Sequence, residues 1–201
     1  MKTIFISLVF LIILNGCEKR DSLQSSMAAI DKIKNRNSYP SVLKNDADRL
    51  TTVLKKNPSL KNSAHHGSIY RIASIKSQDA TDLLVAYLNG LVAMLPPSIP
   101  TEEELVKRAK IGEKKEAISY EIWEILHMIF DCTRRLSGYA DPSADKKVQE
   151  VLERLEKKYH ASDPDKVISR GMRIAIDNGH GEAEKGLTPW QRKNRQPLPM
   201  K

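Results

Sequence analysis

The sequence contains little cysteine, with two in 201 residues. Two cysteines exclude a disulfide-dense scaffold and any zinc or iron–sulfur site built from four cysteines. The sequence also lacks an apolar run of the ~20 residues that a stable membrane span needs. It has no G-x-S-x-G element, no P-loop and no G-x-G-x-x-G loop, which are local signatures of many enzymes. Hydrophobic residues make up 40% of the chain, which is enough to bury a core.

The most specific signal is at the N-terminus. After a short positive start, residues 4–14 are apolar except for Ser7. About 11 apolar residues are too few to span a bilayer and suit the hydrophobic region of a secretory signal. The residues that close this stretch, Leu-Asn-Gly-Cys at 14–17, resemble the lipobox of bacterial lipoproteins, in which a small residue precedes a cysteine.

The lipobox resemblance implies a signal over residues 1–16 and a mature chain that begins at a lipidated Cys17, carrying acyl chains such as palmitate. It implies a bacterial envelope protein for which membrane lipid is one partner. Glu18, rather than aspartate, follows the cysteine, and the resemblance to bacterial lipoproteins then implies the outer membrane, facing the periplasm. From the residues alone, a hydrophobic first helix with a buried thiol and ordinary signal cleavage stay open as alternatives.

Apolar residues recur with helical spacing along the rest of the chain. Leu43, Ala47, Leu50 and Leu54 form one such stripe. No stretch alternates with a period of two, so we expect an all-α protein. The patterns predict helices over about 21–36, 41–56, 66–76, 79–95, 142–160 and 164–177.

Several helix ends carry local signals. Residues 101–104, Thr-Glu-Glu-Glu, form a capping box. Asp141 and Asp163 each precede a proline, so each is expected to cap a helix that begins there. Gly179 is expected to end the last helix as its C′ residue.

The most regular stripe uses spacings of four and three residues. Its members are Ile118, Ile122, Ile125, Ile129, Cys132 and Leu136. We expect Cys132 to be a buried and unreactive thiol, because a nucleophilic cysteine needs exposure and a basic neighbour. Trp123 and Phe130 on the same helix are interpreted as core anchors.

Residues 72–90 resemble a HEAT-type helical repeat. The matching residues are Ile72, Ala73 and Ile75 at the end of the first helix, Ser77 and Asp79 at the turn, and Ala80, Leu83, Leu84 and Leu88 on the second helix. The pairs 21–56 and 142–177 are candidates for further, degenerate copies. We therefore expect either an irregular helical bundle or a short HEAT-like α-solenoid of about six to eight helices. The resemblance implies a binding role through a helical surface.

The possible catalytic patterns are incomplete. Glu124 and His127 have the E-x-x-H spacing of di-iron carboxylate proteins, but the second E-x-x-H that such a site needs is missing. His65 and His66 diverge on a helix and have no partners at zinc spacing. Residues 41–44, Ser-Val-Leu-Lys, match an S-x-x-K without the S-D-N and K-T-G elements that accompany it. We expect no metal, no cofactor and no enzyme activity.

Residues 178–201 carry no periodic apolar face and contain five Lys or Arg against two Glu. The first interpretation is a basic, disordered tail. The second is that Trp190, with Arg192, Lys193 and Arg195, contacts an anionic lipid or glycan surface.

Together these patterns predict a single helical domain over residues 17–177, anchored by lipid. The net charge of +8 is typical of nucleic-acid-binding proteins too, but an exported lipoprotein seldom meets nucleic acid, so none is expected as a partner. The predicted function is a non-catalytic adaptor or assembly factor that binds an unidentified envelope protein. A periplasmic immunity or inhibitor protein is the alternative, followed by an envelope enzyme with an unrecognised site.

Overall fold

The computed structural model describes residues 22–36, 41–56, 63–99, 115–139, 141–160 and 166–185. Within these ranges the chain forms seven helices packed as a bundle, without strands. The first covers residues 22–34. The others are α2 (Ser41–Lys56), α3 (Ser63–Ile75), α4 (Gln78–Met94), α6 (Lys115–Ser137), α7 (Pro142–Tyr159) and α8 (Val167–Lys185). The prediction of an all-α fold with six to eight helices is confirmed.

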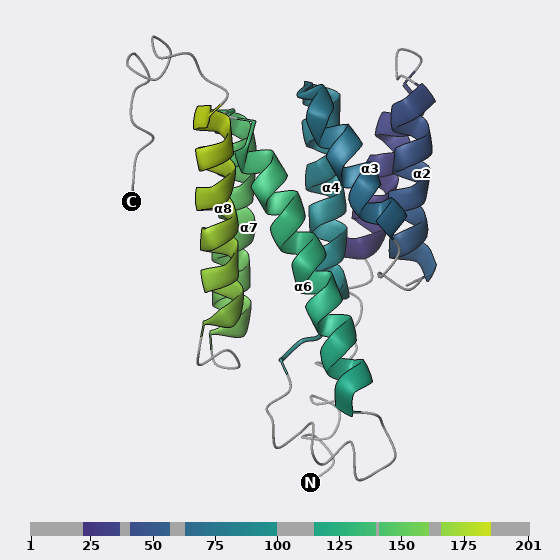
Figure 1. The fold of residues 1–201 in the computed structure, drawn as a ribbon. Helices are drawn as coiled ribbons and strands as arrows, with labels where there is room; N and C mark the ends of the chain where they lie inside the picture. Colours follow the sequence, from purple (N-terminus) through teal and green to yellow (C-terminus); the bar gives the residue numbers. More distant parts are fainter. Residues whose placement is uncertain are drawn as a thin grey trace, which may run out of the picture.

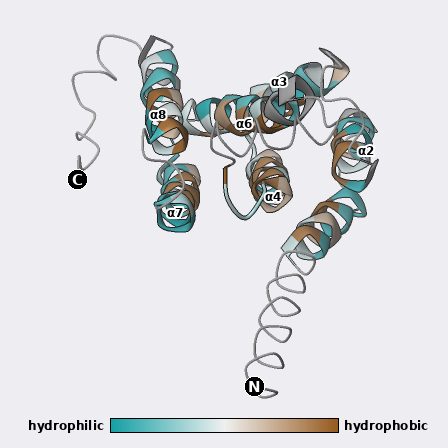
Figure 2. Cartoon of the chain, turned by 90° about the horizontal axis from the view of Figure 1, so that it is seen from below, coloured by the Kyte–Doolittle hydropathy of each residue, from teal (hydrophilic) through white to brown (hydrophobic). Residues whose placement is uncertain are grey.

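The apolar stripes of the sequence form the core. Leu43, Ala47, Leu50 and Leu54 of α2 are all buried, as the helical spacing predicts. α4 is buried over most of its surface, and Figure 2 shows it as the most evenly hydrophobic helix of the bundle. A helix that is apolar nearly all round must be covered on several sides, so α4 is the central element of the fold.

Two helices begin at a side-chain cap, of which only the one at Asp141 was predicted. Ser77, expected only to lie at a turn, precedes α4 in an extended conformation, and its side chain accepts a hydrogen bond from the backbone N–H of Ala80 at 3.2 Å. Asp141 accepts from the N–H of Ser143 at 2.9 Å, with Pro142 opening α7. The capping box at 101–104 lies outside the described residues.

Five helices form two layers, with α3, α6 and α8 in one and α4 and α7 in the other (Figure 2). Contacts between the hairpins α3–α4 and α6–α7 join residues 63 to 67 positions apart in the sequence. The pairs are Ile72–Tyr139 between α3 and the end of α6, and Asp82–Lys147, Asn89–Arg154 and Pro96–Tyr159 between α4 and α7. The nearly constant separation means that the two hairpins stack in parallel and in register.

This register identifies α6–α7 as the unit stacked on the predicted hairpin at 66–95. The pair 142–177, a candidate for a further copy, corresponds to α7 and α8. Helix α8 instead extends the layer of α6, parallel to it, because Phe130 lies beside Gly171 and Gly138 beside Gly179. Membership of a HEAT-type family stays a prediction.

The prediction for the end of the last helix is wrong. α8 continues to Lys185, so residues 178–185, assigned to the tail, are helical, and Gly179 lies inside the helix. A Cβ atom at Gly179 would lie 2.4 Å from the carbonyl oxygen of Arg134, and one at Gly171 would lie 2.4 Å from the ring of Phe130. Small residues thus form the face that lets α8 approach α6 closely, and a search for large apolar residues misses such a face. The predicted cap at Asp163 lies outside the described residues.

The helices of the bundle run between two ends. The proximal end is where helix 22–34, α3, α6 and α8 begin. The distal end is where these four helices terminate. α6 runs obliquely through the bundle, and its first turns extend beyond the neighbouring helices at the proximal end, which is the lower end in Figure 1. Among the described helices, none is long and apolar enough to cross a membrane.

Candidate functional site

The thiol of Cys132 lies in the centre of the core. It is fully buried, and its Sγ atom lies 3.4 Å from the carbonyl oxygen of Leu84. Burial, with a smaller contribution from Asp131, raises the pKa of Cys132 far above its ordinary value. The neighbouring hydroxyl of Tyr87 is also buried, and burial raises its pKa as well. The prediction of a buried thiol is confirmed. That it is unreactive stays a prediction, which follows because a protonated thiol in apolar surroundings is a poor nucleophile.

The E-x-x-H pair does not gather further ligands. Glu124 is half-buried near the exposed Tyr120, whose pKa is raised by a hydrogen bond to the Glu124 carboxylate. His127 is exposed, and its ring centroid lies 6.2 Å from that of Trp123. Across the part of the chain that the structure describes, no group of three or more His, Cys, Asp or Glu could hold a metal ion.

The two adjacent histidines diverge as expected. His65 is 6% exposed, whereas His66 is exposed. Both ring nitrogens of His65 lack a hydrogen-bond partner within the described residues. Burial lowers the pKa of His65, and the nearby His66 and Arg49 lower it further. His65 is therefore a neutral core histidine at neutral pH.

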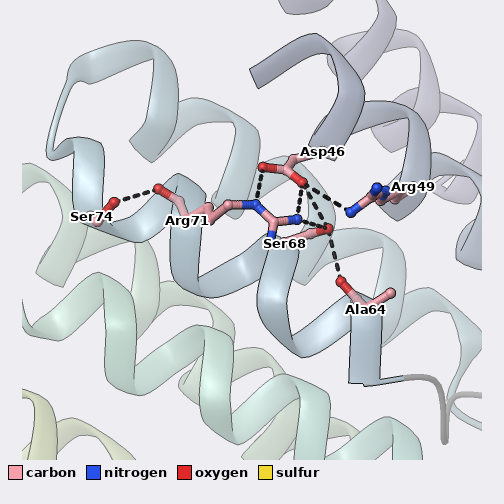
Figure 3. Close-up of polar contacts among 6 residues, drawn as sticks. All are labelled: Asp46, Arg49, Ala64, Ser68, Arg71 and Ser74. Carbon is pink, nitrogen blue, oxygen red and sulfur yellow. Dashed lines mark hydrogen bonds and ion pairs between the residues drawn. The ribbon is translucent and has the colours of Figure 1, made fainter. Parts of the chain in front are cut away.

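The most extensive buried polar contact joins α2 to α3 (Figure 3). Asp46 is 2% exposed, and the guanidinium of Arg71 donates to its two oxygens at 2.9 and 2.5 Å. The Ser68 hydroxyl lies 3.0 Å from the same carboxylate, and Arg49 lies 3.9 Å from it. The bidentate pair is a strong and directional contact. Because both carboxylate oxygens are bonded within the protein, this cluster fixes α3 on α2 rather than presenting a reactive group.

The interpretation of Trp123 as a core anchor is wrong. Its side chain is 47% exposed, whereas Phe130 is partly buried against the core. The stripe explains the difference, because Ile125, Ile129 and Cys132 take the core-facing positions of α6 and Trp123 falls beside them. Trp123 therefore lies on the solvent-exposed side of α6.

A pocket of about 170 Å³ lies at the distal end, between the last turns of α3, α6 and α8. Its polar and aromatic lining residues are Tyr70, Ser74, Lys76, Arg135, Tyr139 and Glu182. Small-molecule sites usually enclose about 300–1,000 Å³. The pocket is therefore of a size to receive one side chain of a protein partner.

The pocket is held in shape by contacts between the three helices. The guanidinium of Arg135 lies 4.6 Å from the ring centroid of Tyr70, a cation–π distance. Arg134 pairs with Asp131 at 2.7 Å and with Glu182 of α8 at 3.6 Å. Tyr70 itself is 57% exposed. The exposed ring of Tyr70 is therefore held at the edge of the pocket by its cation–π contact with Arg135.

A second hollow, of about 390 Å³, lies at the proximal end between the last turn of α7 and the first turns of α8. Glu156 and Arg173, on its lining, form an ion pair at 2.6 Å. Lys166 and His160 also line it. The paired carboxylate is held by its arginine, so the hollow shows no acid–base pair arranged for chemistry.

Comparisons of the chain with protein-family models, with curated proteins and with solved structures find no match. The fold and the distal pocket must therefore carry any statement about function. The predicted lipidation residue Cys17 and the predicted tail contacts Trp190, Arg192, Lys193 and Arg195 lie outside the described residues.

Sequence reasoning did not find the distal pocket. Tyr70 and Arg135 are far apart in the sequence, and neither belongs to a motif. The one signal that could have indicated it is the position of Tyr70. Tyr70 lies between the buried Ile69 and Ile72, and therefore off the apolar stripe of α3. An aromatic residue that falls off a core stripe is a candidate for a surface contact.

Proposed function

We propose that the protein is a lipid-anchored adaptor of the bacterial envelope, without catalytic activity, that binds another envelope protein through its distal end. The observation that supports this most is the exposed Tyr70 braced by Arg135 at the rim of a pocket sized for a side chain. Tyrosine and arginine are enriched among the residues that dominate protein–protein binding energies. The anchor itself is supported by the lipobox resemblance at residues 14–17.

The non-catalytic part of the proposal is supported by how the described titratable residues are used. Asp46 is bonded by Arg71, Glu156 by Arg173, and Asp145 lies 2.9 Å from His180. These carboxylates serve contacts between helices. A catalytic site would instead bring a perturbed acid or base to an open pocket.

The test is affinity capture of the tagged full-length protein from crosslinked native membranes, with quantitative mass spectrometry. Tyr70→Ala removes the exposed ring, and Ile174→Ala is a matched control because Ile174 is also exposed (52%) but lies on α8 away from the pocket. The proposal predicts one dominant protein with the parent and the control, and its loss with Tyr70→Ala. Equal capture by both variants would contradict the assignment of the distal pocket. Circular dichroism of both variants reports whether the fold is intact.

An immunity or inhibitor protein is the alternative function within the same class of binding proteins. It requires one tight partner, with a dissociation constant of about 1 nM or below. Titration of the captured partner against the purified protein distinguishes the two, because an adaptor that exchanges partners binds more weakly.

A further inference from the structure

We propose that the proximal end of the bundle lies against the anionic membrane surface, with Trp123 and Tyr120 of α6 in the lipid headgroup region. This inference rests on the proposed lipid anchor and specifies how the anchored protein is oriented. It assigns a role to exposed aromatic residues that neither the core nor the distal pocket uses.

The position of the anchor supports this orientation. Arg36, just beyond helix 22–34, pairs with Asp79 in the first turn of α4, at the distal end. Helix 22–34 therefore begins at the proximal end. Cys17 precedes Ser22 by five residues, which span at most about 18 Å when fully extended. A lipid on Cys17 would hold the proximal end close to the bilayer.

The aromatic residues lie where such a contact would form. Trp123 is 47% and Tyr120 43% exposed, and a spacing of three residues places them on one face of α6. These turns of α6 extend beyond the neighbouring helices at the proximal end (Figure 1). Val167, in the first turn of α8 at the same end, is 40% exposed. Tryptophan and tyrosine favour the membrane–water interface because each combines an apolar ring with a polar group.

The charge of the proximal end complements anionic lipids. Five exposed basic residues occur in the last turns of α2 and α7 and around the start of α8, namely Lys55, Lys157, Lys158, Lys166 and Arg170. Among the described residues at the same end, Glu121 of α6 is an exposed carboxylate, and Glu156 of α7 is paired with Arg173. Clustered lysine and arginine near a bilayer bind phosphatidylglycerol-type headgroups electrostatically.

The two tryptophans of the chain allow a direct test, since Trp123 lies on the proximal end and Trp190 in the tail. Trp190→Phe leaves Trp123 as the only tryptophan, and Trp123→Phe leaves Trp190. Each full-length variant is purified from a bacterial host and reconstituted in phosphatidylethanolamine–phosphatidylglycerol vesicles with brominated acyl chains, which quench nearby tryptophan. The mass of the purified protein reports whether Cys17 carries lipid.

The inference predicts that Trp123 is quenched and blue-shifted in these vesicles. It also predicts that added salt reduces the quenching in the Cys17→Ser variant, which lacks the acyl chains. Lipidated protein with unquenched Trp123 would overturn the inference and leave the anchor in place. Quenching of Trp190 alone would overturn it in favour of membrane contact through the tail. Protein without lipid on Cys17 would overturn the proposed anchor and, with it, this orientation.

Discussion

The two ends of the bundle use their charges in different ways. At the distal end, Arg36 pairs with Asp79, Lys147 with Asp82, and Arg134 with Glu182, so charges join helices to one another. At the proximal end, the pair Glu156–Arg173 also joins two helices, but the cations Lys157, Lys166 and Arg170 are exposed in the last turn of α7 and around the start of α8.

This difference suggests a division of roles. Ion pairs between helices fix the shape of the distal surface, which suits recognition of a folded partner. Exposed lysines and aromatic rings make a surface that adapts to a fluid layer of anionic headgroups. α6 and α8 contribute their first turns to the proximal end and their last turns to the distal end. Substitutions at one end of these helices can therefore separate the two roles.

The largest effect is expected from removing the anchor. Cys17→Ser should move the protein from the membrane to the soluble fraction, because each buried acyl CH₂ contributes about 0.8 kcal/mol to membrane binding and lipoproteins carry many. Fractionation followed by immunoblotting measures this. If the variant stayed with the membrane in high salt, another segment would hold the protein there.

A large loss of stability is expected at the crossing of α6 and α8. Gly179→Ala places a methyl group against the backbone of α6, and overpacking of this kind costs about 3 kcal/mol. Gly181→Ala is the matched control, since its Cβ atom would meet nothing within 4 Å, and alanine should stabilise the helix by about 0.5–1 kcal/mol. Urea unfolding of both variants gives the two values. Equal stabilities would mean that the helices do not approach as closely as described.

An intermediate effect is expected on partner binding. Tyr70→Ala should weaken binding of the captured partner by about 2 kcal/mol, the range of a binding hot spot, without changing the quenching of Trp123 by lipid. Calorimetric titration and vesicle fluorescence on the same variant test both halves. Loss of both activities together would show that the ends are not independent.

The smallest effect is a pH dependence that originates at the proximal end. Burial lowers the pKa of His65 in the folded state, so below about pH 6.5 the unfolded chain binds its proton more readily than the folded one. The free energy of unfolding should therefore fall as the pH drops from 7 through the ordinary histidine range. In thermal unfolding at pH 5 and pH 7, His65→Leu should reduce this fall the most, and His66→Asn should reduce it less, because His66 contributes less than burial to the lowered pKa of His65. An identical pH response in the two variants would contradict a buried, neutral His65.

The stripes of large apolar residues predicted the helices and most of the core, because burial of such residues dominates helical packing. They did not predict the face of α8 that packs on α6. Gly171 and Gly179 allow the two helices to approach closely but add no apolar side chain to the stripe. The interpretation of Trp123 was wrong because it relied on the size of the side chain. The position of Trp123 beside the apolar stripe of α6 indicated the surface.

The distal pocket could not be predicted for another reason. It forms only when hairpins about 65 residues apart in the sequence stack in register, as the contacts Asp82–Lys147 and Asn89–Arg154 show. No local pattern carries that register. The lipobox-like pattern at residues 14–17, by contrast, is local, so an anchor could be proposed from the sequence alone.

The most direct test of this account is site-specific photo-crosslinking in native membranes, with the probe at Ser74 on the distal pocket or at Tyr120 on the proximal end. The account predicts one discrete protein adduct from position 74 and lipid adducts from position 120. Lipid adducts from position 74, or the same protein adduct from both positions, would contradict the division of the molecule into a partner-binding end and a membrane end.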